Sequence, residues 1–245
     1  MKLAMAGMPL NRSIWLLIAC LMLIFLGSAL ISPRTGYGQL NLNFDDIEID
    51  VLHVQGNVYM LVGAGGNITL QVGEEGVLIV DSMYPELADR VLGIIRELSD
   101  QPIRYLINTH VHPDHIGGNA TFAQAGTNFA AGNVAGLIDD AANTATIIAH
   151  ENVLLRMSSQ ETPPPFEAWP TDTFFNDSKE VYFNGEAVRV LHQPAAHTDG
   201  DSIVFFRRSD VVSTGDLFVT TGYPYIDLAR GGSIQGVISA LNQIL

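Results

Sequence analysis

A short run of metal-ligand side chains constrains this sequence more than any other feature. Directly after the apolar stretch 103–107 the chain reads His110-Val111-His112-Pro113-Asp114-His115. If that stretch is a buried strand, the first two histidines leave its end on the same side, because side chains in a strand alternate. Pro113 then bends the chain and returns Asp114 and His115 toward the same centre. Unpaired imidazoles and carboxylates are costly to bury, whereas both are normal zinc ligands. The run therefore predicts a metal site at a strand end.

Three positions outside this run, one before it and two after it, are candidates for the same centre. His197 lies in a turn just before the strand-like run 202–206, Asp216 follows the run 211–214, and Asp81 ends the four-residue apolar run 77–80. Taken alone, each is as readily a cap, a salt-bridge partner or a satisfied polar residue. His53, His150 and His192 lie on other predicted elements, and for these we expect structural roles.

In this order and spacing the motifs resemble those of the metallo-β-lactamase-fold hydrolases, from about residue 51 to the end. The resemblance implies an α/β (α+β) fold, a four-layer αββα sandwich of two mixed β-sheets flanked by helices. It implies that one zinc is bound by His110, His112 and His197, and a second by Asp114 and His115, with Asp216 bridging the two ions. Asp81 would orient a ligand histidine, as groups behind metal ligands commonly do.

The sequence departs from the family pattern in two respects. No histidine follows His197, where the family completes its second zinc site, so we expect the last part of the second half of the fold to be missing from a truncated chain. Two zinc ions are then expected in a full-length chain and one tightly held ion here. The second departure concerns substrate: Asp216 and Val219 stand where zinc β-lactamases of the Cys-bearing kind have cysteine and a drug-binding lysine. Arg230 is a possible substitute for that charge.

The resemblance implies an exported zinc-dependent hydrolase that attacks a carbonyl with a metal-bound hydroxide. Asp114 would be the catalytic residue that steers the hydroxide, and the substrate would be an ester, thioester, lactone or β-lactam. The alternatives are a class B-like β-lactamase acting in antibiotic breakdown, an iron-using oxidoreductase, and a non-catalytic member of the same fold.

The amino-terminal 38 residues read as a targeting segment. Lys2 and Arg12 precede an unbroken apolar run, 14–26, and small residues follow it. This is the pattern of a secretory signal peptide, with an uncleaved anchor as the alternative. We therefore expect residues 1–38 to be a signal or anchor, residues 39–245 to form the metallo-β-lactamase-like domain, and the protein to be periplasmic or secreted.

Charge limits the partners of that domain. The net charge of the chain is −14, and the three basic residues of the first 38 leave 9 basic and 26 acidic side chains in the rest. Nucleic-acid binding needs a basic surface, so we expect a small-molecule substrate and no nucleic acid, with membrane contact only through the amino-terminal segment.

Hydrophobic patterning completes the expectations. Short strands are predicted near 52–54, 58–62, 68–72, 77–80, 103–107, 188–191, 202–206 and 211–213. Helices are predicted over 85–98, 135–157 and 234–245, and Thr162-Pro163-Pro164-Pro165 should end the second of them. Strands that first pair locally and then alternate with helices indicate packed sheets covered by helices.

Overall fold

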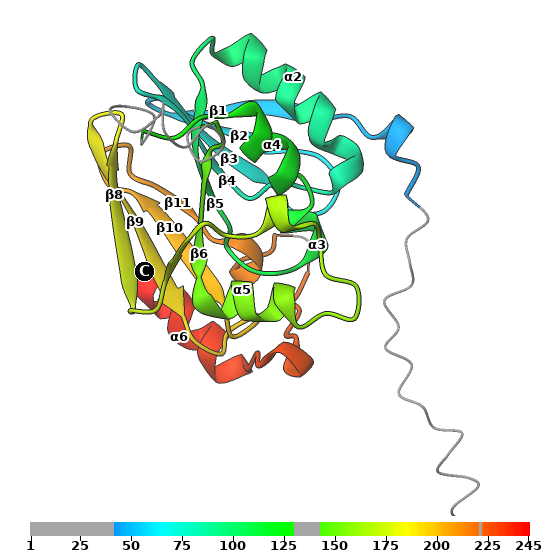
Figure 1. The fold of residues 1–245 in the computed structure, drawn as a ribbon. Coiled ribbons are helices and arrows are strands. Elements are labelled where there is room, and N and C mark those ends of the chain that lie inside the picture. Colours follow the sequence, from blue (N-terminus) through cyan, green and yellow to red (C-terminus); the bar gives the residue numbers. More distant parts are fainter. Residues whose placement is uncertain (1–41, 130–142, 221) are drawn as a thin grey trace, which may run out of the picture. The chain divides into compact units, whose positions relative to one another are not determined.

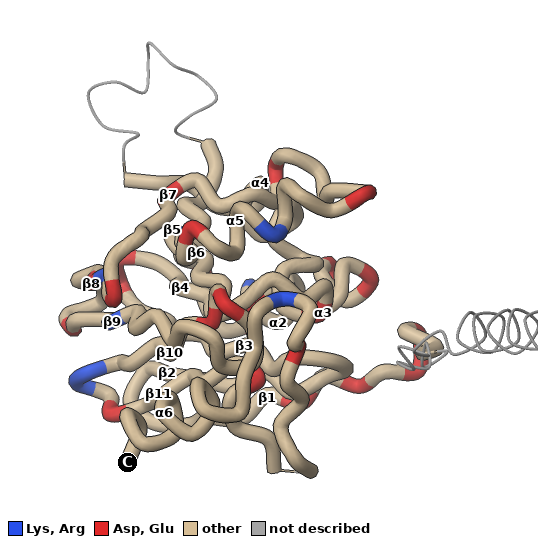
Figure 2. The backbone as a smooth tube through the Cα atoms, turned by 90° about the horizontal axis from the view of Figure 1, so that it is seen from below, with Lys and Arg blue, Asp and Glu red and all other residues tan. Residues whose placement is uncertain are grey.

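The computed structural model describes residues 42–129, 143–220 and 222–245, and residues 44–245 form one compact unit. The predicted signal or anchor at 1–38 lies outside the described residues. Among the residues described, no helix is both long and apolar enough to cross a membrane. Asp and Glu are distributed over helices, strand ends and turns, and the fewer Lys and Arg lie among them (Figure 2).

A seven-stranded sheet in the order β1 to β7 forms the first half of the fold (Figure 1). The first four strands pair antiparallel and the last three pairings are parallel. The strands are β1 (Asp50–Gln55), β2 (Val58–Val62), β3 (Ile68–Gly73), β4 (Gly76–Val80), β5 (Ile103–Ile107), β6 (Thr146–His150) and β7 (Asp172–Phe174). Because β4 and β5 run parallel, their carboxyl ends meet at one edge of the sheet.

A four-stranded sheet in the order β11-β10-β9-β8 forms the second half. Its strands are β8 (Ser178–Phe183), β9 (Glu186–Gln193), β10 (Asp201–Phe206) and β11 (Val211–Ser213). All of its described pairings are antiparallel, so this sheet differs from the mixed sheet expected from the sequence.

The main hydrophobic core lies between the two sheets. It joins Leu78 and Val80 of β4 and Ile107 of β5 to Val204 and Phe206 of β10. Side chains of a strand alternate between its faces, so Ile203 of β10 points the other way and packs with Val237 and Ala240 of α6 (Ile234–Ile244). The second sheet is therefore covered by a helix on its outer face.

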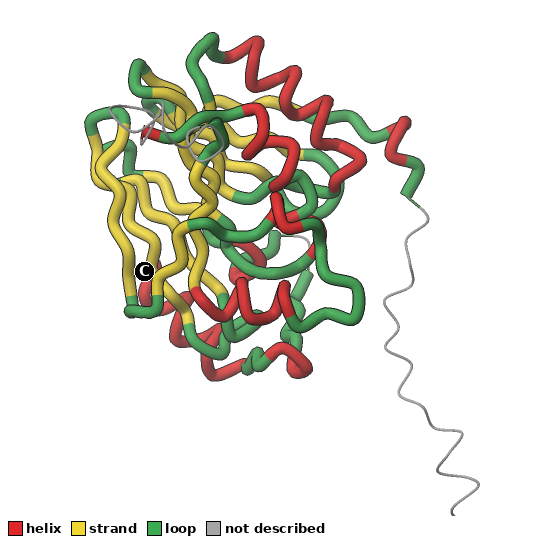
Figure 3. Tube along the Cα trace, viewed as in Figure 1, coloured by secondary structure: helices red, strands yellow, loops and turns green. Residues whose placement is uncertain are grey.

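Helices cover the outer face of the first sheet as well. These are α2 (Ala88–Leu98), α3 (Pro113–Ile116), α4 (Asn119–Ala125) and α5 (Glu151–Ser158), with a 3₁₀ turn at Pro85–Leu87 leading into α2. Val153 and Met157 of α5 pack against Ala149 of β6. The order helix, sheet, sheet, helix can be followed in Figure 3, and it is the predicted four-layer αββα arrangement.

The helix predicted over 135–157 is wrong at residues 146–150 and correct from Glu151 on, and its part at 135–142 lies outside the described residues. Residues 146–150 form strand β6, and the helix α5 begins only at Glu151, with His150 as its N-cap. A short apolar run of this kind fits a buried strand as well as a helix, and periodicity cannot separate the two. Parallel pairing with β5 decides for the strand. The strands β7 and β8 were not predicted, and the other predicted strands and helices are present.

Candidate metal centre

The predicted metal cluster lies where β5 ends and turns into α3. The chain leaves β5 at Ile107, and α3 begins at Pro113 with His112 as its N-cap. Proline suits the first helical position because its φ is preset and its missing N–H would have no partner there. The tight turn places His110 and His112 on one side and presents His115 from the short helix beside them.

Four predicted ligands converge in a first group: His110, His112, His197 and Asp216. Nδ1 of His112 lies 3.1 Å from Nε2 of His110 and 2.9 Å from Nε2 of His197. Oδ2 of Asp216 lies 3.5 Å from Nε2 of His197 and 3.9 Å from Nε2 of His110. Ligands about 2.0–2.2 Å from a tetrahedral zinc are about 3.3–3.6 Å apart, so the donor set and its spacing fit one zinc ion.

His115 and Asp114 lie on the other side of Asp216. Nε2 of His115 is 3.1 Å from Oδ1 of Asp216 and 3.7 Å from Oδ2 of Asp114. Nε2 of His115 is buried, and no well-formed hydrogen bond satisfies it. The two oxygens of Asp216 thus face two separate groups of donors, which is the arrangement predicted for a bridging carboxylate.

Asp81 holds this edge together from behind. Its Oδ1 accepts a hydrogen bond from the backbone N–H of Thr109 at 2.7 Å, and its Oδ2 accepts one from the Thr109 hydroxyl, also at 2.7 Å. Oδ2 also lies 2.7 Å from Nδ1 of His115. Asp81 has a φ of +63°, a conformation uncommon for non-glycine residues and most often adopted by Asn and Asp. Asp81 therefore contacts His115 directly and reaches His110 through Thr109.

The hydrogen bonds behind the rings leave the inner nitrogens without protons. Because the Thr109 hydroxyl donates to Asp81, it accepts from Nδ1 of His110 at 3.1 Å. A carbonyl can only accept, so Nδ1 of His197 donates to the Tyr225 carbonyl at 2.7 Å. In a neutral imidazole the other nitrogen, Nε2, is then a lone pair. The lone pairs on Nε2 of His110 and of His197 therefore point into the same space near His112. Converging lone pairs give this space a negative potential, which favours a bound cation.

The pKa values of the histidines differ between the two groups of donors. Burial, reinforced by the neighbouring histidines His115, His197 and His112, lowers the pKa of His110 well below its usual value, which keeps it neutral. Burial also acts to lower the pKa of His115, but the carboxylates of Asp81 and Asp216 outweigh it and raise that pKa well above the usual value. Burial acts to raise the pKa of Asp216, and the close contact with His115 and its charge lower that pKa on balance.

Asp216 reaches the site from a turn and not from a strand end. It lies in a 3₁₀ turn, Gly215–Leu217, after β11. Gly215 has a φ of +52°, and a Cβ at this position would lie 2.6 Å from Oγ1 of Thr109. The turn can approach the end of β5 this closely because residue 215 has no side chain.

Asp201 supports the turn that carries His197. Its two oxygens accept from the backbone N–H of Thr198 at 2.8 Å and from the Thr198 hydroxyl at 2.7 Å. Burial raises the pKa of Asp201 to about 6, against the lowering effect of these hydrogen bonds. The carboxylate fixes the residue next to a metal-ligand candidate, and no pattern in the sequence singles Asp201 out.

Two further contacts were missed at the sequence level. Asp227 lies 2.9 Å from Nε2 of His112, and Arg230 forms a salt bridge of 2.7 Å with Asp227. Arg230 is therefore engaged by a carboxylate next to the site, which argues against its expected role as a substitute for a substrate-binding lysine. Gly66 also lies against the site: a Cβ there would lie 2.6 Å from Nε2 of His115. Spacing in the sequence carries no signal for such contacts.

The other histidines lie away from this centre, as expected. His53 is exposed and its Nε2 contacts the Gly56 carbonyl at 2.9 Å. His150 and His192 stack with ring centroids 3.5 Å apart, and Nε2 of His192 donates to the Asp199 carbonyl. Burial and the neighbouring His192 lower the pKa of His150 to about 4.

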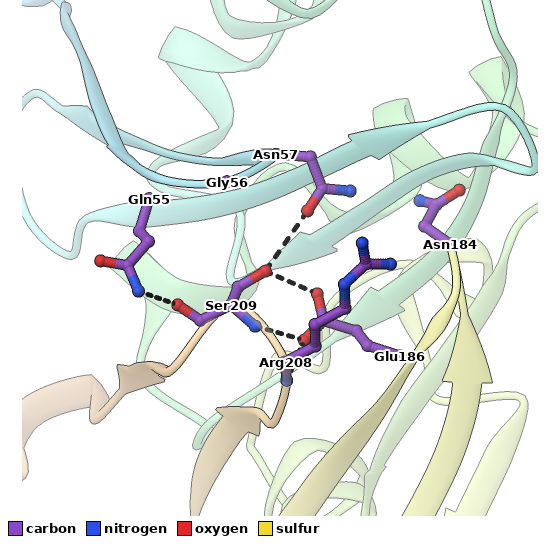
Figure 4. A pocket seen from close by; sticks show the side chains of 7 residues that line it. All are labelled: Gln55, Gly56, Asn57, Asn184, Glu186, Arg208 and Ser209. Carbon is purple, nitrogen blue, oxygen red and sulfur yellow. Dashed lines mark hydrogen bonds between the residues drawn. The ribbon is translucent and has the colours of Figure 1, made fainter.

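A polar cleft of about 400 Å³ lies elsewhere in the fold (Figure 4). It is lined by residues of three hairpin turns, among them Asn57, Glu186 and Ser209. The Glu186 carboxylate already accepts hydrogen bonds from Ser209 N, Ser209 Oγ, Arg208 N and the Gln71 amide. These donors are supplied by the protein itself, so the carboxylate ties the turns together and does not mark a reactive centre.

Comparison with known proteins identifies the family of this chain. The sequence model of the metallo-beta-lactamase superfamily matches residues 61–245. A linear primary-alkylsulfatase from a Pseudomonas species is 26% identical over 184 residues, which are 64% of this chain and 34% of the alkylsulfatase. The chain thus spans about a third of the length of that curated relative.

Solved structures share the fold at low identity. A metallo-beta-lactamase from Pontibacter korlensis superposes with a TM-score of 0.59 at 15% identity, over 80% of this chain and 85% of that one. A class B3 di-zinc metallo-beta-lactamase from an Alaskan soil metagenome superposes with a TM-score of 0.52 at 17% identity, over 68% and 60% of the two chains.

Proposed function

The chain belongs to the metallo-beta-lactamase superfamily, and from that premise we propose that it is a zinc-dependent hydrolase. The ligands would be His110, His112 and His197 for one ion and Asp114 and His115 for a second, with Asp216 between them. The observation that carries the proposal is the two-sided position of Asp216, with one oxygen toward His197 and His110 and the other toward the buried Nε2 of His115.

The residues of this chain have separable tasks in the proposed reaction. A bound zinc ion supplies Lewis acidity at neutral pH. Asp81, Thr109 and the Tyr225 carbonyl hold the ligand rings in place through the nitrogens that face away from the centre. The Asp114 side chain is 23% exposed, so water can reach it, and its Oδ2 lies 3.7 Å from Nε2 of His115. We assign to it the orientation of the attacking water and the acceptance of its proton.

The substrate we propose is a carbonyl compound such as an ester, thioester or lactone, with β-lactams as poor substrates. The proposal rests on Asp216 and Val219, which replace a cysteine and a lysine, and on the engagement of Arg230 by Asp227. A β-lactam carboxylate would lack a cation there, and a hydrogen bond to a charged group contributes about 1.5–3 kcal/mol. That corresponds to about 10- to 150-fold in affinity or rate.

Sulfate esters are a second candidate substrate class. The observation that favours them is the alkylsulfatase relative, which matches over 64% of this chain. A sulfate ester and a carboxylic ester both need a polarised oxygen and an activated water, so the same residues would serve either reaction.

A panel of substrates tests the proposal. Full-length protein, reconstituted with zinc, would be assayed on a chromogenic cephalosporin, an aryl ester, a thioester, a lactone and an alkyl sulfate, with and without chelator. We expect hydrolysis of one of the non-lactam substrates that the chelator abolishes. Cephalosporin turnover at or above about 10⁴ M⁻¹s⁻¹ would refute the substrate assignment. Absence of transition metal after reconstitution would refute the metal centre itself, and iron with redox activity would favour an oxidoreductase.

We also propose that the protein is exported through its first 38 residues, as a periplasmic or secreted enzyme. The support is the basic start and the apolar run 14–26. Fractionation of cells that express the whole chain, followed by mass measurement of the amino terminus, distinguishes a cleaved signal from an anchor. Recovery of the intact chain in the cytoplasm would refute export.

A further inference from the structure

The segment from Tyr225 to Ser233 passes behind two of the ligand histidines. Its backbone is fixed to the His197 turn: the N–H of Asp227 donates to the His197 carbonyl at 2.8 Å, and the N–H of Ser233 donates to the Ala196 carbonyl, also at 2.8 Å. The 3₁₀ turn Leu228–Arg230 lies within this segment and has Asp227 as its N-cap. The position of Asp227 is therefore set by the same turn that positions His197.

The Asp227 side chain faces His112. Only 4% of it is exposed, and its Oδ2 lies 2.9 Å from Nε2 of His112. Burying an ionised carboxylate is costly unless the carboxylate is paired and accepts hydrogen bonds. Asp227 has such partners: Arg230 Nη1 donates to Oδ2 at 2.7 Å and Arg230 N donates to Oδ1 at 3.1 Å. The carboxylate is thus held ionised and in one orientation.

An ionised carboxylate can only accept hydrogen bonds, so the proton of neutral His112 must lie on Nε2. Nδ1 of His112 is then the lone pair, and this is the nitrogen that faces Nε2 of His110 and of His197. With the proton on Nδ1 instead, two ligands of the first site would face an N–H. Asp227 thus selects the one neutral form of His112 that is able to bind the metal.

We infer that Asp227, held by Arg230, is a positioning residue that fixes His112 in its metal-binding tautomer and so sets the affinity of the first metal site. The inference rests on the proposed metal centre but not on the identity of the substrate. Asp227 contacts the ring nitrogen on the far side from the other ligands, which distinguishes this role from that of a metal ligand.

The test compares Asp227→Asn with a control, Asp172→Asn. Asp172 also forms a salt bridge, of 2.8 Å to Lys179, but its partner is not a ligand. Long-range ¹H–¹⁵N correlation spectra of the metal-free protein report the tautomer of each histidine. We expect His112 to carry its proton on Nε2 in the unchanged protein and in the control, and to populate both tautomers in Asp227→Asn.

Metal affinity gives a second readout. Competition with a chelator should show zinc bound about 10- to 100-fold more weakly by Asp227→Asn, and no change in the control. Arg230→Gln keeps the carboxylate and should shift affinity in the same direction by less, which protects the test if Asp227→Asn folds poorly. A lowered melting temperature with unchanged tautomer and zinc affinity would show a purely structural role and overturn the inference. Failure to hydrolyse any substrate, with these two readouts as expected, would count against the proposed function alone.

Discussion

A methyl group at residue 66 would reach the ring of His115, a proposed ligand of the second ion. A Cβ built on Gly66 lies 2.3 Å from Cε1 and 2.6 Å from Nε2 of His115. Carbon atoms in contact are about 3.5–4.0 Å apart, so in Gly66→Ala the ring must withdraw by at least about 1.2 Å. His115 is 1% exposed and is held by Asp81 at 2.7 Å, which leaves little room for that withdrawal.

The expected cost follows from these contacts. Inserting a methyl group into a packed site costs about 1–3 kcal/mol. For a domain of this size that lowers the melting temperature of the metal-free protein by about 2–12 °C. Ligand positions in a metal site tolerate about 0.2 Å, so a ring displaced by about 1 Å no longer coordinates. We expect Gly66→Ala to weaken the binding of the second, less tightly held ion, while the first group, with His110, His112 and His197, retains its own.

Calorimetric melting of the metal-free protein and a zinc titration measure the two effects. Gly93→Ala is the matched control, because a Cβ at Gly93 meets nothing within 4 Å and the residue lies inside helix α2. That variant should be stabilised by up to about 1 kcal/mol through helix propensity. If Gly66→Ala melts at the temperature of the unchanged protein and binds zinc with the same affinities, the assignment of His115 to a rigid second site is incorrect.

Two further predictions concern single histidines. His112→Ala should abolish hydrolysis and weaken metal binding, whereas His192→Ala, which removes a ring stacked on His150, should leave both nearly intact; equal losses in the two variants would mean that the damage comes through folding. The pKa of His150 is lowered to about 4 in the folded protein, so protonation of this ring favours the unfolded state. The free energy of unfolding is therefore unaffected by this ring above about pH 6.5. It falls by up to about 3 kcal/mol as the pH drops from there toward 4. Urea unfolding of the metal-free protein at pH 7 and pH 4.5 should show a smaller pH dependence in His150→Gln, and parallel curves for the two proteins would contradict the assignment.

The local sequence was sufficient where a motif and its element coincide. The apolar run 103–107 is strand β5, Pro113 opens α3, and the histidines between them converge as their spacing predicts. The strand pattern likewise indicated packed sheets with covering helices. It was insufficient at 146–150, where an apolar run has no local preference and pairing with β5 selects the strand.

Only the tertiary structure decided what surrounds the ligands. Local spacing is enough to predict that the side chains at 110, 112 and 115 converge. The direction of a side chain in a strand or turn follows from the backbone over a few residues. The partners of those donors come from far along the chain: Asp81 to His115, and Asp227 to His112. Hydrogen bonds between such distant residues depend on how the sheets and turns pack, which leaves no periodic trace in the sequence. The local sequence therefore determined which residues can bind a metal ion, whereas tertiary packing determined the protonation and the rigidity of those residues.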